Sequence, residues 1–323
     1  MNHEPTDITV AVLKGGPDSE HEVSLASGGQ VAEALRGHRG YRVLERLVDR
    51  PSVEDLLELG ADVIFPVLHG PWGEGGPLQE RLEASGIPFV GCGSNAAATG
   101  MNKDATKRAC VRAGIPTPDW QLVESGGPIT IPAPCVVKPV DEGSSFGVRL
   151  CHDERQATLA TGELHDSGRS VMRESLIEGR ELTVGIVGQR VLPIIEIRSA
   201  GHFYDYHAKY VSEETEYLLR PPLPQEVEAD CRRHALRLWK ELGARDVGRV
   251  DFMFDGSDCW ALEINTMPGF TEHSLVPMAA RHDGMDMTTL CSTLVEMARD
   301  RAEDHQAGLP GGDPLNRIGA SGP

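Results

Sequence analysis

An excess of basic residues is missing from this sequence. Its 323 residues include 31 Lys and Arg against 49 Asp and Glu, which gives a formal net charge of −18 at pH 7. A nucleic-acid groove needs clustered Lys and Arg to meet the phosphate backbone, so this balance argues against a nucleic-acid partner. Any anionic ligand must instead be bound by a few local cations and backbone N–H groups.

Signals for membranes, export and disulfides are missing as well. No run reaches the ~18 apolar residues of a membrane-spanning helix, and the first residues, MNHEPTD, lack the apolar region of a signal peptide. The seven cysteines form no CxxC pair, and an odd number does not suit a disulfide framework. We therefore expect free thiols in a reducing cytoplasm, with no membrane as a partner.

The two common glycine-rich phosphate-binding motifs are absent. The sequence contains neither G-x-G-x-x-G nor G-x-x-x-x-G-K-[ST], and it has no internal repeat. Strand and helix signals alternate in the first part of the chain, with a strand over 8–13, a helix over 24–35 and a strand over 61–68. This order predicts an α/β unit that binds its ligands at the carboxyl ends of the strands.

Two polar residues follow strand ends in this first unit. Glu22 lies beyond the first strand and His69 directly follows the third, so both are candidates for one crevice. Glu20 is expected to serve the N-terminus of the following helix. Residues 71–76 predict a glycine-rich loop, and residues 88–91 predict a last short strand. A purely structural role is the alternative for each of these polar residues.

The middle of the chain carries a second possible ligand site. The pattern predicts a helix over 103–112 and a buried strand over 135–139 that contains Lys138. The loop over 141–148 follows, and its small residues allow backbone N–H groups to approach phosphate; a surface hairpin is the alternative. A loop over 201–210, rich in Tyr and His, predicts a mobile active-site flap.

One stretch of the C-terminal third predicts a β-hairpin followed by a glycine-containing loop and a helix. Because side chains alternate along a strand, Asp251 and Glu263 converge if they lie opposite each other, with Asn265 on the same face. Such oxygens suit Mg²⁺, and ordinary solvated polar residues are the alternative. The convergence predicts a connecting loop that includes Cys259, since pairing Phe254 with Cys259 would turn Glu263 to the other face.

Six separated motifs together resemble those of the D-alanine–D-alanine ligases, members of the ATP-grasp superfamily: GGPDSEHEVSL, VLHGPWGEGGPLQ, VVKPVDEGSSFGV, FYDYHAKY, GRVDFMF and LEINTMPGFTEHSLVP. The resemblance implies an α/β protein, α+β overall, with a Rossmann-like pre-ATP-grasp domain at 1–100. A two-lobed ATP-grasp domain follows, with a lid at 101–190 and a catalytic lobe at 191–301. Residues 302–323 predict a disordered tail. The implied reaction is ATP-dependent joining of two D-alanines through an acyl phosphate, for peptidoglycan synthesis.

The resemblance also implies functional residues. Two Mg²⁺ or Mn²⁺ ions are implied at Asp251, Glu263 and Asn265. The implied nucleotide contacts are Lys103, Lys138, Glu174, Leu176, Ile177 and Glu181. The implied catalytic groups are Glu22, Ser144, Tyr210, Arg249 and Gly269, the last two as oxyanion stabilisers. The implied substrate contacts are His69, Lys209, Ser274 and Leu275.

Substrate choice follows from the flap motif. Tyr210, preceded by Lys209, is the aromatic residue that in this family accompanies dipeptide rather than D-lactate ester formation. Lys14, Ser175 and His207 depart from the family pattern. A related ligase that makes another D-amino acid amide or D-alanyl-D-lactate is one alternative, and a catalytically silent nucleotide-binding protein is another. The resemblance further implies a homodimer.

Overall fold

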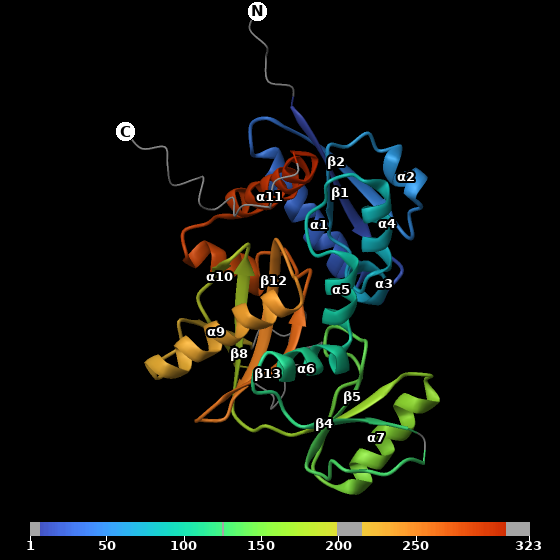
Figure 1. Ribbon diagram of the computed structural model, residues 1–323, viewed down its shortest axis with the longest axis vertical. Helices are drawn as coiled ribbons and strands as arrows, with labels where there is room; N and C mark the ends of the chain where they lie inside the picture. Colours follow the sequence, from blue (N-terminus) through green and yellow to red (C-terminus); the bar gives the residue numbers. More distant parts are fainter. Residues whose placement is uncertain (1–6, 125, 199–214, 308–323) are drawn as a thin grey trace, which may run out of the picture.

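Three sheets, each with its own helices, make up the described part of the protein (Figure 1). The computed structural model describes residues 7–124, 126–198 and 215–307, with the side chains of 304–307 left aside. The N-terminal unit and the small α7-bearing unit lie at opposite ends of the long axis, and the C-terminal sheet lies between them. The mixture of helix and sheet confirms the predicted fold class.

The N-terminal unit is built on a parallel sheet in the order β2-β1-β3. The strands are β1 (Ile8–Gly15), β2 (Tyr41–Val48) and β3 (Val63–Pro66). The middle of β1, an unbroken apolar run, is fully buried, as in strands covered on both faces. The unit's helices are α1 (His21–Arg36), α2 (Val53–Leu57), α3 (Gly70–Glu74), α4 (Pro77–Ser85) and α5 (Ser94–Met101).

Two segments of this unit differ from the predictions. The predicted loop over 71–76 contains the helical turn α3, because Pro71 fits the first turn of a helix. The predicted strand over 88–91 is reduced to a single bridge between Phe89 and Ile64. Gly91 adopts a φ of +104°, which ends the extended run there.

The small unit is a four-stranded antiparallel sheet in the order β4-β7-β5-β6, with one helix packed on it. Its elements are β4 (Trp120–Val123), β5 (Cys135–Pro139), β6 (Arg149–Cys151), α7 (Glu154–Asp166) and β7 (Val171–Ser175). We call this unit the lid. Its core is small and separate from the rest, with Val137, Cys151 and Leu164 among its members.

The C-terminal sheet runs β11-β10-β8-β12-β13, and β9 pairs with β8. The strands are β8 (Arg180–Val187), β9 (Arg190–Val191), β10 (Ile195–Arg198), β11 (Glu216–Leu219), β12 (Val247–Phe254) and β13 (Cys259–Asn265). Its helices are α6 (Lys103–Arg112), α9 (Gln225–Glu241) and α10 (Leu275–His282).

The sheet membership of β8 corrects the predicted boundary between lid and catalytic lobe. β8 lies between β10 and β12, so the lid ends before Arg180 rather than at 190. α6 also packs on β13 and not on the lid. The last helix, α11 (Met287–Ala307), extends beyond the predicted start of the tail at 302 and packs against α1. The first and last described helices therefore share one core (Figure 1).

The hairpin of β12 and β13 contains a β-bulge. Phe254 pairs with Cys259, so the loop is shorter than predicted. Asp251 nevertheless pairs with Glu263, because β13 has one extra residue, Leu262, at that point. The predicted convergence of the two carboxylates is confirmed, and the predicted loop is wrong.

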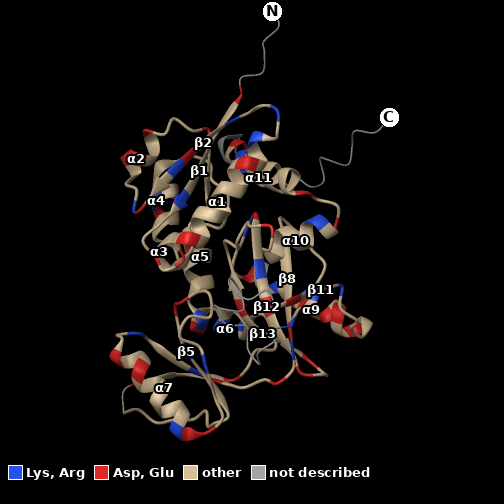
Figure 2. Cartoon of the chain, turned by 180° about the vertical axis from the view of Figure 1, so that it is seen from behind, with Lys and Arg blue, Asp and Glu red and all other residues tan. Residues whose placement is uncertain are grey.

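Charge is mixed over the surface. Figure 2 shows Lys and Arg scattered among Asp and Glu over all three units in that view, rather than gathered on one face. No helix among the described residues has the length and apolar character needed to cross a bilayer.

Candidate active site

The first of two cavities, about 110 Å³, lies where the N-terminal unit, the loop after β5 and the C-terminal hairpin meet. Segments far apart in the sequence contribute polar side chains to it: Glu20, His69, Glu74, Lys103, Ser144, Arg249, Glu263, Asn265, Thr271, His273 and Ser274. This convergence could not be predicted from any one segment. We call it the inner cavity.

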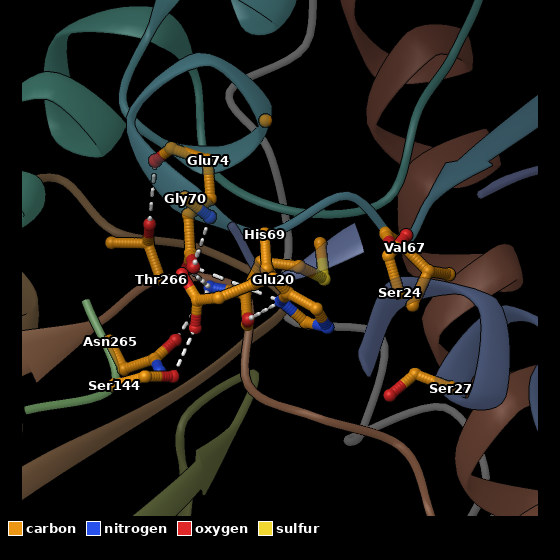
Figure 3. Close-up of polar contacts among 12 residues, drawn as sticks. Glu20, Ser24, Ser27, Val67, His69, Gly70, Glu74, Ser144, Asn265 and Thr266 are labelled. Atoms are coloured by element: carbon orange, nitrogen blue, oxygen red, sulfur yellow. Dashed lines mark hydrogen bonds and ion pairs between the residues drawn. The ribbon is translucent and has the colours of Figure 1, made fainter. Parts of the chain in front are cut away.

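Glu20, and not Glu22, reaches the inner cavity. Glu20 is 7% exposed and accepts a hydrogen bond from the Ser144 hydroxyl (Figure 3). Glu22 is exposed on the first turn of α1 and does not line either cavity. The sequence prediction therefore placed the acidic residue one turn position too late, because α1 begins at His21 and turns Glu22 outward.

His69 and Glu74 form a buried pair at the wall of the inner cavity (Figure 3). The His69 Nδ1 atom lies 3.7 Å from a Glu74 carboxylate oxygen and 3.1 Å from the Met267 carbonyl oxygen. Burial lowers the pKa of His69, but Glu74 and then Glu20 outweigh it, so the pKa is raised above 6.5. The buried Nε2 atom has no hydrogen-bond partner among the described residues, which leaves a polar atom for a ligand.

The start of α10 closes another side of this cavity. Ser274 is the N-cap residue, and its hydroxyl accepts a 2.9 Å hydrogen bond from the Thr271 N–H. A side chain at Gly269 would place its Cβ 2.8 Å from the Ser274 hydroxyl oxygen, so only glycine allows this approach. Gly269, Ser274 and Leu275 all line the cavity, and free N–H groups at a helix start favour an anion.

The second cavity is larger, about 590 Å³, and lies between the lid and the C-terminal sheet. Every nucleotide contact implied by the sequence motifs lines it: Lys103, Lys138, Glu174, Leu176, Ile177 and Glu181. Val136, Val148, Leu150, Met253 and Leu262 add apolar walls. A flat apolar slot with a few polar groups suits a purine nucleotide. We call it the outer cavity.

A buried ionic trio lies at the wall of the outer cavity. The Lys138 ammonium donates to Glu174 at 2.8 Å, and the Lys107 ammonium forms an ion pair with the other carboxylate oxygen. Burial raises the pKa of Glu174, but Lys138 and Lys107 outweigh burial and hold the pKa below its usual range. Glu174 therefore stays ionised although it is only 2% exposed.

The two cavities meet at Lys103 and Glu263, which line both. The Lys103 ammonium lies 3.3 Å from Glu263 and donates to the Glu142 carbonyl oxygen at 2.5 Å. A group transferred from a ligand in the outer cavity to one in the inner cavity has to pass this point. A cation here can neutralise the charge of such a group.

The predicted metal ligands lie beside this junction. Asp251 is 6% exposed and accepts two 2.8 Å hydrogen bonds from Arg249 and one of 2.6 Å from the Thr183 hydroxyl. Asp251 and Glu263 line the outer cavity, and Asn265 lines the inner one. No described cluster of three His, Cys, Asp or Glu side chains forms a metal site, so the third oxygen has to come from the Asn265 amide. Two facing carboxylates and an amide fit a hard cation such as Mg²⁺.

The remaining predicted residues are accounted for as follows. Lys209, Tyr210 and His207 lie outside the described residues. Ser175 lines the outer cavity. Lys14 points away from both cavities and donates to Glu45 at 2.6 Å, so this departure from the family pattern lies outside the two cavities.

Known proteins share this sequence over nearly its whole length. A family model described as D-ala D-ala ligase C-terminus matches residues 111–296, and one described as D-ala D-ala ligase N-terminus matches residues 45–92. The D-alanine–D-alanine ligase of Desulforudis audaxviator is 40% identical over 303 residues, which cover 90% of this chain and 99% of the relative. The chain belongs to the D-alanine–D-alanine ligase family. D-alanine–D-alanine ligase B of Chromobacterium violaceum is also 40% identical, over 297 residues, 89% of this chain and 96% of the relative.

Solved structures of D-alanine–D-alanine ligases have the same fold. The Bacillus anthracis ligase complexed with ATP has a TM-score of 0.81 and 29% identity, covering 93% of this chain and 99% of that one. The VanG D-Ala:D-Ser ligase of Enterococcus faecalis has a TM-score of 0.78 and 26% identity, covering 90% and 99%. The chain is thus a ligase of this family with the ATP-grasp architecture.

Four residues of the ligase site were missed by sequence reasoning. Glu20 and Glu74 were each close to a residue that attracted attention, but only the tertiary structure shows which carboxylate is buried. Thr183 and Lys107 looked like ordinary strand and helix residues. Burial of a lysine on an otherwise amphipathic helix was the one signal for Lys107, and it is visible only in the folded protein.

Proposed function

We propose that this ligase joins two D-alanine molecules, with ATP in the outer cavity and both amino acids in the inner cavity. The observation that carries the proposal is the junction at Lys103 and Glu263, which connects a nucleotide-shaped cavity to a polar one. The product would be D-alanyl-D-alanine, the dipeptide that the family supplies for peptidoglycan.

The outer cavity would bind the nucleotide through its base and phosphates. The backbone around Leu176 and Ile177 would meet the adenine, Glu181 the ribose, and Lys138 with Lys103 the phosphates. Asp251, Glu263 and Asn265 would hold Mg²⁺ or Mn²⁺. When bound, the ion would neutralise charge on the transferred phosphoryl group.

The inner cavity would orient the two amino acids. The Glu20 carboxylate, with His69 nearby, would hold the ammonium group of the first D-alanine, whose carboxylate accepts the phosphoryl group at the junction. Ser274 and the N-terminus of α10 would receive the carboxylate of the second D-alanine. Its amine would attack the acyl phosphate, and Arg249 with the N–H of Gly269 would stabilise the oxyanion.

Ser144 would close the inner cavity from the lid side. It lies in the loop after β5 and donates to Glu20 of the N-terminal unit, so the contact joins two units across the bound substrate. Lys209 and Tyr210 would complete this closure. A homodimer is proposed from the family alone.

The test is D-alanine-dependent release of phosphate from ATP by the purified protein with Mg²⁺, followed by product analysis with D-alanine, D-serine and D-lactate as paired substrates. D-alanyl-D-alanine as the main product supports the proposal. A main product containing D-serine or D-lactate would replace D-alanine as the second substrate, and no D-alanine-dependent release would overturn the proposal.

A further inference from the structure

Lys107 is buried beside the outer cavity without lining it. Its side chain is 0% exposed, and the ammonium has three acceptors. These are Glu174, the Thr117 hydroxyl at 2.8 Å and the Pro118 carbonyl oxygen at 3.1 Å. Three acceptors satisfy the three N–H donors of a lysine. The ammonium is therefore fixed in place and has no donor left for a ligand.

The contacts of Lys107 cross the joint between lid and C-terminal sheet. Lys107 lies on α6, which packs on β13, whereas Glu174 lies on β7 of the lid. Thr117 extends the connection, because its hydroxyl donates to the Ala261 carbonyl oxygen of β13 at 2.7 Å. The network thus attaches one lid carboxylate to the body of the protein.

The other side of Glu174 faces the nucleotide. Lys138, on β5 of the lid, donates to Glu174 and lines the outer cavity. Two ammonium groups share one carboxylate in this trio, so one positive charge is not matched within it. An anionic phosphate in the cavity can draw on that charge through Lys138, while Lys107 keeps Glu174 from being left as a buried unpaired charge.

We propose that Lys107 is a positioning residue for the nucleotide: it fixes Glu174 at the lid joint, and Glu174 in turn holds Lys138 at the cavity wall. The proposal rests on the function proposed above, since it takes the outer cavity to be the ATP site. It assigns Lys107 to nucleotide binding without contact with the nucleotide. A purely structural role predicts lower stability but unchanged nucleotide affinity.

The test variant is Lys107→Met, which keeps the length of the side chain and removes its charge. We expect the KM for ATP to rise about tenfold or more, because a hydrogen-bonded buried charge pair is lost. We expect kcat to change less than about threefold, and the KM for D-alanine to stay constant. The Kd for ADP with Mg²⁺, measured by calorimetry without D-alanine, should rise in parallel with the KM for ATP.

The matched control is Arg108→Met on the same helix, whose side chain is 63% exposed and pairs with Asp104. It should bind ADP as the wild type does. The double variant Lys107→Met with Glu174→Gln should lose less affinity than the two single losses predict together, because both changes act through one contact. If Lys107→Met does not fold, Thr117→Val takes its place, with an expected rise of about threefold in the Kd for ADP.

Unchanged ADP affinity in Lys107→Met, or in Thr117→Val where the former is unfolded, would overturn the proposal whatever the Tm. Strictly additive losses in the double variant would also overturn it. A wild-type protein that binds ADP but releases no phosphate with D-alanine would overturn the proposed function and leave this inference standing. A wild type that binds no ADP would overturn both.

Discussion

Asp251 and Glu263 face each other across β12 and β13, although the loop between the strands would by itself place them on opposite faces. Phe254 pairs with Cys259 at the loop, and the extra residue Leu262 then shifts the register by one. As a result Leu262 and Glu263, which are neighbours in sequence, both line the outer cavity. A regular strand would point them to opposite faces.

Deletion of Leu262 tests this relationship. Without the extra residue, regular pairing would continue from the loop and turn Glu263 away from Asp251. We expect turnover to fall at least about a thousandfold, as for loss of an essential charged group, with most β-structure retained by circular dichroism. Leu262→Ala keeps the residue count and is the control, with turnover within about tenfold of wild type. Full activity in the deletion variant would show that the bulge does not set the site.

Asp251→Asn tests the metal site. The change removes one anionic oxygen and leaves the Arg249 guanidinium without its carboxylate partner. We expect kcat/KM to fall at least about a hundredfold, with a higher Mg²⁺ concentration needed for half-maximal rate. The matched control is Asp258→Asn in the exposed turn of the same hairpin, which should remain within about twofold. Equal Mg²⁺ dependence of Asp251→Asn and wild type would contradict the assignment.

Glu20 and Glu22 offer a paired test on one turn of chain. Glu20→Gln removes the charge at the inner cavity, so we expect the KM for D-alanine to rise about tenfold or more, because a charge-assisted contact is lost. Glu22→Gln changes an exposed residue and should leave both kcat and KM within about twofold. Initial rates over a range of D-alanine concentrations, with saturating ATP, distinguish the two. The reverse pattern would restore Glu22 as the functional residue.

The His69–Glu74 pair predicts a pH-dependent contribution to stability. Because the folded-state pKa of His69 is raised above 6.5, its stabilising effect is fully present below the unfolded pKa and is lost as pH rises through the folded value. Glu74→Gln removes the main cause of that raise. We expect the Tm of this variant to lie furthest below that of wild type near pH 6, with the gap narrowing toward pH 9.

Thermal unfolding of both proteins across that pH range measures the gap. Loss of other contacts of Glu74, such as its 3.2 Å hydrogen bond from the Gly70 N–H, would lower the Tm equally at every pH. A gap that is constant or widens with pH would therefore show that the charge on His69 does not contribute.

Local chemistry made much of the fold predictable. The unbroken apolar run of β1, the Asn102 cap before α6 and the turn residues 255–258 act over short distances, and the structure has each of them. The prediction failed where contacts between distant segments decide. β8 joins the C-terminal sheet because its partners β10 and β12 bury both of its edges, and no signal within residues 180–187 shows that.

The sequence by itself determined which residue types are available for nucleotide, metal and substrate, because the motifs carry their carboxylates, lysines and glycines in fixed local order. Only the tertiary structure decided which of them meet. Glu20 rather than Glu22 faces Ser144, Lys107 reaches Glu174 through the interior, and one extra residue in β13 brings Glu263 opposite Asp251. The physical reason is that burial, strand register and cross-unit contacts depend on packing between segments far apart in sequence, which local preferences do not specify.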